Sequence, residues 1–120
     1  MIEGTVHKGS MMGRKIGFPT INVSFDRVEL PFGVYGAKVQ TPLGTFKGAL
    51  HFGPRHVINS PEALLEVYLL DFAGDIYNKK VIISVFDKIR DTANFDSLDS
   101  LKKQIHYDVE AVRALPIFLN

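Results

Sequence analysis

The chain has 120 residues, 46% of them hydrophobic and 22% charged, which is the balance of one globular domain covering residues 1–120. Its net charge of +1 argues against a nucleic-acid or anionic-membrane partner, because proteins that bind such surfaces are usually strongly basic. The sequence has no cysteine, which excludes disulfides and thiol catalysis and suits a reducing cytoplasm. The first residues lack the apolar run of a signal peptide, and no stretch approaches the roughly 20 apolar residues of a spanning helix. We therefore expect a soluble, cytoplasmic protein.

The first segment with a clear pattern is "GRKIGFPTINVSF", residues 13–25. Thr20 and Asn22 are two positions apart, so in an extended chain they lie on one side while Ile21 and Val23 lie on the other. One side is suited to a hydrophobic core. The other carries a hydroxyl and an amide next to a group of glycines.

The glycines could form an anion-binding loop. They lie at positions 4, 9, 13 and 17, interleaved with Lys8, Arg14 and Lys15. A glycine-rich loop lets backbone N–H groups approach a phosphate without obstruction by side chains. However, neither the P-loop motif nor the dinucleotide-binding motif is present. On spacing alone, an ordinary glycine-rich loop with solvated lysines is the better interpretation.

Four strands are predicted in the middle of the chain. Residues 33–40 and 45–52 are predicted to form a hairpin around the turn "TPLG", and residues 64–72 and 80–89 are rich in β-branched and aromatic side chains. Asn78, between the last two strands, suits a left-handed turn position. The residues expected on the apolar faces of the hairpin are Tyr35, Ala37 and Val39 in its first strand and Phe46, Leu50 and Phe52 in its second.

From residue 97 the hydrophobic period changes to that of a helix. Asp96 or Ser97 can supply the N-cap, and Pro116 marks the end. The apolar stripe consists of Leu98, Leu101, Ile105, Val109 and Val112. Antiparallel strands followed by one helix predict a small β-barrel with a C-terminal helix packed on it.

Several blocks of the sequence together closely resemble the riboflavin kinase (flavokinase) family. These blocks are "GTVHKGSMMGRKIGFPTINV", "LPFGVYGAKV", "LLEVYLLDF" and "DIYNKKVIISVFDKIRDTANFDSLDSLKKQIHYDVEAVR", and they follow the family's order over nearly the full chain. The resemblance implies an all-β fold, a six-stranded Greek-key closed β-barrel with a C-terminal α-helix packed on it. It also implies transfer of the γ-phosphate of ATP to the 5′-hydroxyl of riboflavin, giving FMN and ADP.

The resemblance implies a nucleotide and metal site in the N-terminal segment. Pro19-Thr20-Ile21-Asn22 corresponds to the family's Pro-Thr-Ala-Asn motif, in which the threonine and the asparagine hold Mg²⁺ and the nucleotide phosphates. Whether Zn²⁺ or Mn²⁺ replaces Mg²⁺ stays open. Ile21 replaces a small residue and is expected to point inward. The full set implied for nucleotide and phosphate binding is Gly9, Gly13, Arg14, Gly17, Pro19, Thr20 and Asn22, with the glycine-rich loop closing over the phosphates.

The resemblance also implies that Glu66 is the general base. Glu66 is the one ionisable group in the run "ALLEVYLL", so partial desolvation would raise the pKa of its carboxyl and make it a better proton acceptor for an alcohol. The alternative is a glutamate at a solvent-facing strand end. The family match favours catalysis.

The flavin site implied by the resemblance draws on the C-terminal blocks. Arg90 matches the family's arginine over the isoalloxazine ring, where a planar guanidinium can stack or donate to carbonyls. Phe95, Ile105 and Asp108 occupy matching positions. Phe95 could instead support the start of the helix, and Ile105 belongs to the apolar stripe. Asp108 interrupts that stripe, which favours a functional role.

Some features differ from the family's pattern. The segment "HFGPRHVINSPEAL" has His56-Val57 where Pro-Thr is usual, which puts a phosphate role for Arg55 in doubt. The histidines at 7, 51, 56 and 106 show no metal-ligand spacing and are interpreted as solvated or hydrogen-bonded. The bifunctional family members carry an N-terminal adenylyltransferase with an H-x-G-H motif, which is not present here. We expect FMN as the product, with an N-terminal FAD synthetase domain as a partner if the chain is a fragment.

Two other hypotheses are distinguishable from a kinase. The first is a non-catalytic flavin-binding or regulatory module on the same barrel, which the altered Arg55-His56 loop favours. The second is an oligonucleotide-binding barrel, which the 11% aromatic content favours and the near-zero net charge opposes.

Overall fold

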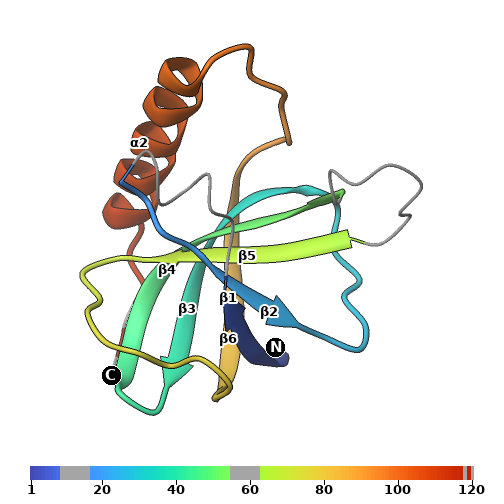
Figure 1. Cartoon of the computed structure of the whole chain (residues 1–120), viewed down its shortest axis with the longest axis vertical. Coiled ribbons are helices and arrows are strands. Elements are labelled where there is room, and N and C mark those ends of the chain that lie inside the picture. Colours follow the sequence, from blue (N-terminus) through green and yellow to red (C-terminus); the bar gives the residue numbers. More distant parts are fainter. Residues whose placement is uncertain (9–16, 55–62, 118, 120) are drawn as a thin grey trace.

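The computed structural model describes residues 1–8, 17–54, 63–117 and 119, and these form a closed barrel with a helix on its outer wall (Figure 1). The strand order around the barrel is β1-β2-β5-β4-β3-β6, and the pairings are antiparallel. β2 lies beside β5, whereas β3, β4 and β5 are sequential neighbours, which is the Greek-key arrangement. The elements are β1 (Ile2–Lys8), β2 (Ile21–Ser24), β3 (Gly33–Thr41), β4 (Gly44–Pro54), β5 (Ala63–Leu69), β6 (Lys80–Arg90) and α2 (Leu98–Ala114). The predicted fold class is confirmed.

The four strands predicted from residue patterns are present, with small differences in their bounds. The largest difference is in β5, predicted over 64–72, which ends at Leu69 because Asp71 adopts a positive φ of 58°. Asn78 has a φ of 65°, as predicted for a left-handed turn residue. The residue pattern alone did not predict β1, since its alternation is interrupted by Gly4 and it buries a single residue, Val6.

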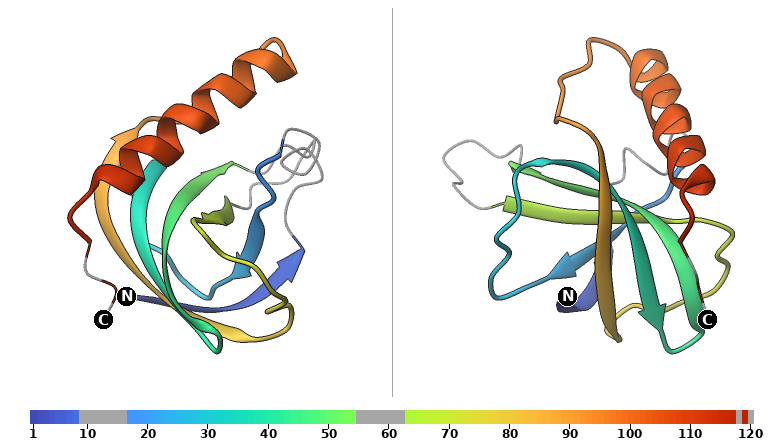
Figure 2. Two further views of the ribbon diagram at one scale, coloured as in Figure 1. Left: turned by 90° about the vertical axis from the view of Figure 1, so that its left-hand side faces the viewer. Right: turned by 180° about the vertical axis from the view of Figure 1, so that it is seen from behind.

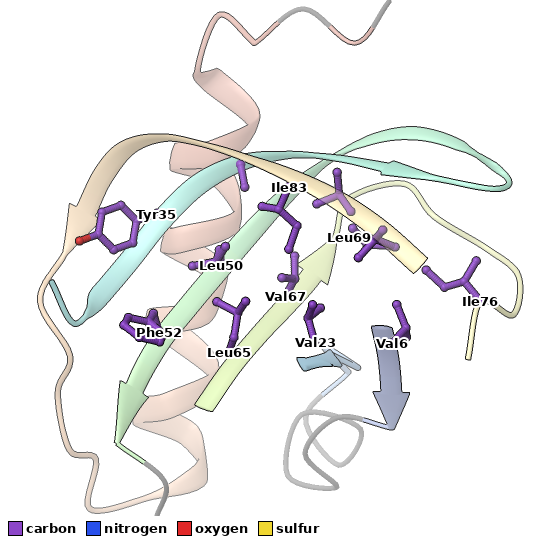
Figure 3. Close-up of a cluster of buried hydrophobic side chains, with 13 residues drawn as sticks. Val6, Val23, Tyr35, Leu50, Phe52, Leu65, Val67, Leu69, Ile76 and Ile83 are labelled. Carbon is purple, nitrogen blue, oxygen red and sulfur yellow. The ribbon is translucent and has the colours of Figure 1, made fainter. Parts of the chain in front are cut away.

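The main core fills the barrel interior. Figure 3 shows side chains from all six strands pointing toward one another, among them Val6, Val23, Leu50 and Val67. Tyr35, Ala37 and Val39 are buried on the interior face of β3, and Phe46 packs against the same core. Ile21 also packs there, which confirms that its larger side chain points inward. The period of two therefore sorts each strand into an interior and an exterior face.

A second, smaller core lies between the barrel's outer face and α2, and Figure 2 shows the helix lying along that face. Val109 and Val112 of α2 are buried against Leu70, and Ile105 packs beside them. Leu98, the first residue of the predicted stripe, is 46% exposed, so its assignment to the core was wrong. The N-terminal part of α2 extends past the end of the barrel (Figure 1).

The two ends of α2 are capped as the sequence predicted. Ser97 is the N-cap, and its hydroxyl accepts a hydrogen bond of 3.1 Å from the backbone N–H of Ser100. At the other end the chain turns extended at Leu115, directly before Pro116. Lys47 of β4 donates to the backbone carbonyls of Arg113 and Leu115, at 2.8 Å each, and so attaches this end of the helix to the barrel.

The surface around α2 carries an exposed ion pair. Arg113 donates to the carboxylate of Asp71, at 2.9 Å in its shorter contact, and this hydrogen bond raises the pKa of Arg113 above its ordinary value. Both side chains are largely exposed, so the pair contributes little to stability.

Among the residues described, no helix combines the length and the apolar character needed to cross a bilayer.

The close approach of β1 to β2 predicts that Gly4 tolerates no side chain. A Cβ at Gly4 would lie 2.1 Å from the carbonyl oxygen of Ser24 and 2.4 Å from Cγ1 of Val23. Gly4→Ala should therefore lower the free energy of unfolding by about 1–3 kcal/mol, measured by urea denaturation. Gly36→Ala is the matched control, because the atom its Cβ would meet is the terminal Cδ1 of Leu115, which can move away. Equal stability of the two variants would contradict the predicted backbone clash.

Candidate active site

Four polar side chains lie in one row across four neighbouring strands. The strand registers pair His7 of β1 with Asn22 of β2, Asn22 with Glu66 of β5, and Glu66 with His51 of β4. The residues next to them along the strands face the interior, so the row itself lies on the outer face of the barrel. These interior neighbours are Val6, Val23, Leu65, Val67, Leu50 and Phe52.

The same row reaches the residue predicted to contact the flavin. His51 pairs with Val34 of β3, and Val34 pairs with Arg90 of β6 next to a register shift. Asn22 and Glu66 lie on adjacent strands, and Arg90 lies three strands beyond Glu66. Neighbouring strands are about 4.8 Å apart. The register thus brings three of the predicted site residues onto one line, although they are widely separated in the sequence.

Thr20 and Asn22 each present a buried oxygen to the site. Thr20 Oγ1 and Asn22 Oδ1 are buried and find no hydrogen-bond partner among the residues that the structure describes. The amide nitrogen of Asn22 donates to the backbone carbonyl of Lys8 at 3.0 Å, which directs Oδ1 away from β1. Buried polar atoms in native proteins are nearly always paired, so two such atoms side by side make Thr20 and Asn22 candidate ligand-binding residues. A hydroxyl and an amide oxygen fit a hard cation such as Mg²⁺.

Glu66 lies in the middle of β5, between the buried residues Leu65 and Val67. The alternative interpretation placed Glu66 at the end of a strand, which is not where it lies. The side chain is half-buried, in line with the partial desolvation expected from its apolar surroundings. Asn22 is its direct neighbour on β2, so a carboxylate and the proposed metal ligand lie side by side.

Arg90, Asp108 and Phe95 form one constellation at the other end of the row. Arg90 Nε and Nη2 donate to the two carboxylate oxygens of Asp108, at 2.9 and 2.8 Å, in a bidentate pair. Gln104 adds a third donor to Asp108 at 3.1 Å, and Arg90 Nη1 donates to the backbone carbonyl of Asp91. The guanidinium carbon lies 5.7 Å from the ring centre of Phe95, at cation–π distance.

The predicted flavin residues therefore differ in what they contact. Asp108 is 4% exposed and fully engaged by Arg90 and Gln104, so it holds α2 to the end of β6 and fixes the guanidinium plane. Ile105 packs into the second core, as expected for a member of the apolar stripe of the helix. Phe95 is half-buried and stacks on Arg90.

The rest of the predicted phosphate loop lies largely outside the described residues. Gly9, Gly13 and Arg14 fall there, as do Arg55 and His56 of the altered loop. Gly17 is described, is exposed, and has a φ of 86°, in the left-handed region that favours glycine. Pro19 is also exposed and directly precedes Thr20.

Phe18 anchors the segment that leads into Thr20. Its ring packs edge-to-face on Tyr68 of β5, with the ring centres 5.4 Å apart, and it belongs to the second core. Sequence reasoning missed this contact and two further supporting groups, the Lys8 carbonyl and Gln104. The sequence could have indicated the contact of Gln104 with Asp108, because Gln104 lies four residues before Asp108 and hence on the same face of the helix.

Comparisons with known proteins agree with this geometry. A family model described as "Flavokinase: Riboflavin kinase" matches residues 1–116. The chain is 42% identical to the RNA-binding riboflavin kinase RibR of Bacillus subtilis, covering 93% of this chain and 49% of that protein. It is 44% identical to the bifunctional riboflavin kinase/FMN adenylyltransferase of Haemophilus influenzae, covering 94% of this chain and 37% of that protein. The chain thus spans half or less of the length of these relatives.

Solved structures show the same fold. A structure titled riboflavin kinase from Trypanosoma brucei has a TM-score of 0.65 and 27% identity, covering 93% of this chain and 76% of that chain. A structure titled macrolide-efflux protein from Streptococcus pneumoniae has a TM-score of 0.85 and 35% identity, covering 95% of this chain and 38% of that chain.

The ion pair between the partly buried Arg90 and the buried Asp108 predicts a large stability loss when the acid is neutralised. Asp108→Asn leaves the guanidinium without its counter-charge, so the free energy of unfolding should fall by about 3 kcal/mol, measured by urea denaturation. Asp71→Asn is the matched control: its ion pair with Arg113 is exposed, and asparagine tolerates the positive φ at that position. A comparable loss of unfolding free energy in both variants would show that the loss does not depend on the burial of the ion pair.

Proposed function

The chain belongs to the flavokinase family, and from this premise we propose that it transfers the γ-phosphate of ATP to the 5′-hydroxyl of riboflavin, giving FMN and ADP. The observation that carries the proposal is the row on the barrel's outer face. Asn22, whose buried oxygen has no hydrogen-bond partner within the described part of the chain, lies one strand from the carboxylate of Glu66, and Arg90 lies three strands further along.

The phosphate end of the proposed site is built around Thr20 and Asn22. Their two oxygens are the groups that would hold Mg²⁺, which when bound supplies charge neutralisation on the transferring phosphate. The hydrogen bond from Asn22 to the Lys8 carbonyl keeps the amide from rotating, so that Oδ1 stays directed at the ligand. Phe18, packed on Tyr68, holds the preceding segment in place.

Glu66 is the proposed general base. As the 5′-oxygen attacks the γ-phosphorus, the O–H proton passes to the carboxylate, the new O–P bond forms, and the bond from phosphorus to the β-phosphate oxygen breaks to release ADP. The phosphoryl group needs little covalent help from the protein, so most of the rate enhancement comes from holding the two substrates in line. The fixed register between β2 and β5 supplies that alignment.

Arg90 is the proposed anchor for the isoalloxazine ring. Asp108 and the Asp91 carbonyl hold its guanidinium in one plane, so that stacking on it costs little conformational entropy. The distance of about three strand spacings between Glu66 and Arg90 leaves room for the ribityl chain between the reacting hydroxyl and the ring.

Turnover tests the role of Glu66. The protein is incubated with riboflavin, ATP and Mg²⁺, and FMN is quantified by chromatography. Glu66→Gln should lower kcat by about 10²- to 10⁴-fold, because the proton acceptor is lost while the shape of the side chain is kept. Glu3→Gln, the same substitution at an exposed position of β1, should leave the rate unchanged. Riboflavin binding without any FMN from the wild-type protein would instead indicate a non-catalytic flavin-binding module.

The metal role predicts a different kinetic change at residues 20 and 22. Asn22→Ala should raise the Mg²⁺ concentration needed for half-maximal rate and lower kcat/KM for ATP by about 100-fold, because one of the two ligand oxygens is lost. Thr20→Ser keeps the hydroxyl and should retain most of the activity, whereas Thr20→Val should not. Repeating the titration with Mn²⁺ and Zn²⁺ identifies the preferred ion. An unchanged metal requirement in Asn22→Ala would exclude this residue as a ligand.

A further inference from the structure

We propose that His51 recognises the hydroxyl-bearing chain of the flavin substrate and so determines specificity for a polyol over a plain alkyl alcohol. This inference rests on the proposed function and adds a substrate contact to it. In the sequence, His51 shows no metal-ligand spacing, and the residue pattern gives it no role beyond that of a solvated or hydrogen-bonded histidine. Its position in the folded barrel gives it a specific place between the base and the proposed flavin anchor.

The order of the row places His51 beside the path of the substrate. Reading across the barrel from β2, the row runs Asn22, Glu66, His51, Val34 and Arg90. A substrate whose reacting hydroxyl meets Glu66 and whose ring meets Arg90 must extend over the two strands between them. Those two strands contribute His51 and Val34 to the row, and of these two residues His51 is the polar one. A secondary hydroxyl of the chain would therefore pass within reach of the imidazole.

The direction of the His51 ring supports the same place for the substrate chain. The ring lies over Gly53, two residues further along the same face of β4, because a Cβ at Gly53 would meet His51 Cε1 at 2.8 Å. The same Cβ would lie 3.1 Å from the methyl carbon of Thr92, in the loop that follows Arg90. The imidazole therefore leans from the row toward the Arg90 loop, and glycine at position 53 provides the space it occupies.

The chemistry of an imidazole suits this contact. A neutral imidazole offers one N–H donor and one nitrogen acceptor, so one nitrogen can hold a contact within the protein while the other meets a hydroxyl. His51 is half-buried and held against Gly53, so forming that hydrogen bond costs little side-chain entropy. A site that hydrogen-bonds a substrate hydroxyl disfavours an analogue that lacks it, because the protein group is left unpaired.

A pair of flavins tests the inference. Riboflavin is compared with 7,8-dimethyl-10-(5-hydroxypentyl)isoalloxazine, which keeps the ring and the terminal alcohol but lacks the secondary hydroxyls. The wild-type protein should prefer riboflavin in kcat/KM. His51→Ala should reduce that preference by about 3- to 10-fold, the worth of one neutral hydrogen bond, while kcat/KM for the hydroxypentyl flavin changes little. His51→Asn, which keeps a donor and an acceptor, should recover part of the preference.

Controls separate this role from a structural one. His106→Ala removes an exposed histidine on α2 and should leave the ratio of the two kcat/KM values unchanged. Dissociation constants measured by flavin fluorescence give the same comparison without turnover, and urea denaturation verifies that each variant is folded. If His51→Ala lowers kcat/KM for both flavins by the same factor, the inference is wrong even though the kinase proposal stands. If neither flavin binds to the wild-type protein, the proposed function itself is wrong.

Discussion

The pairing of β2 with β5 is the contact on which the arrangement of the candidate site depends. β2 is four residues long, and its register with β5 joins Ile21 to Val67 and Asn22 to Glu66. A shift of one residue would turn Val67 toward the outside and carry Glu66 into the apolar interior. The burial of Val23 and Val67 in the barrel core therefore fixes the position of the amide and the carboxylate on the opposite face.

Two separate hydrophobic cores support the two ends of the row. The interior core holds the strands that carry Asn22 and Glu66. The second core, between the outer face and α2, holds Phe18 just before Thr20 and also the helix that carries Asp108. The segment at the proposed phosphate end and the helix at the proposed flavin end are thus anchored on one apolar cluster.

The ion pair of Arg90 and Asp108 joins the last strand to the helix across 18 residues of chain. A buried pair of this kind adds little net stability, because desolvation of both charges offsets their attraction. What it does provide is orientation: three donors surround one carboxylate, and the guanidinium plane is set. An anchor for a planar ring needs that orientation more than it needs affinity.

Much of the fold and part of the site could be predicted from the residues. The period-two alternation of β3 and β4, the turn residue Asn78, the Ser97 cap and the stop at Pro116 are local patterns, so short stretches of sequence sufficed for them. The resemblance to the flavokinase family pointed to the barrel and to Thr20, Asn22, Glu66 and Arg90 as residues of one site. It did not indicate how these residues are arranged relative to one another.

Tertiary structure alone decided the row of Asn22, Glu66, His51 and Arg90, the burial of Asp108 against Arg90, and the exposure of Leu98. These depend on which strands become neighbours when the barrel closes and on where the helix passes the barrel's end. Both are settled by contacts between residues tens of positions apart. A local period records which face of an element is apolar, but it carries no information about the partner that this face meets.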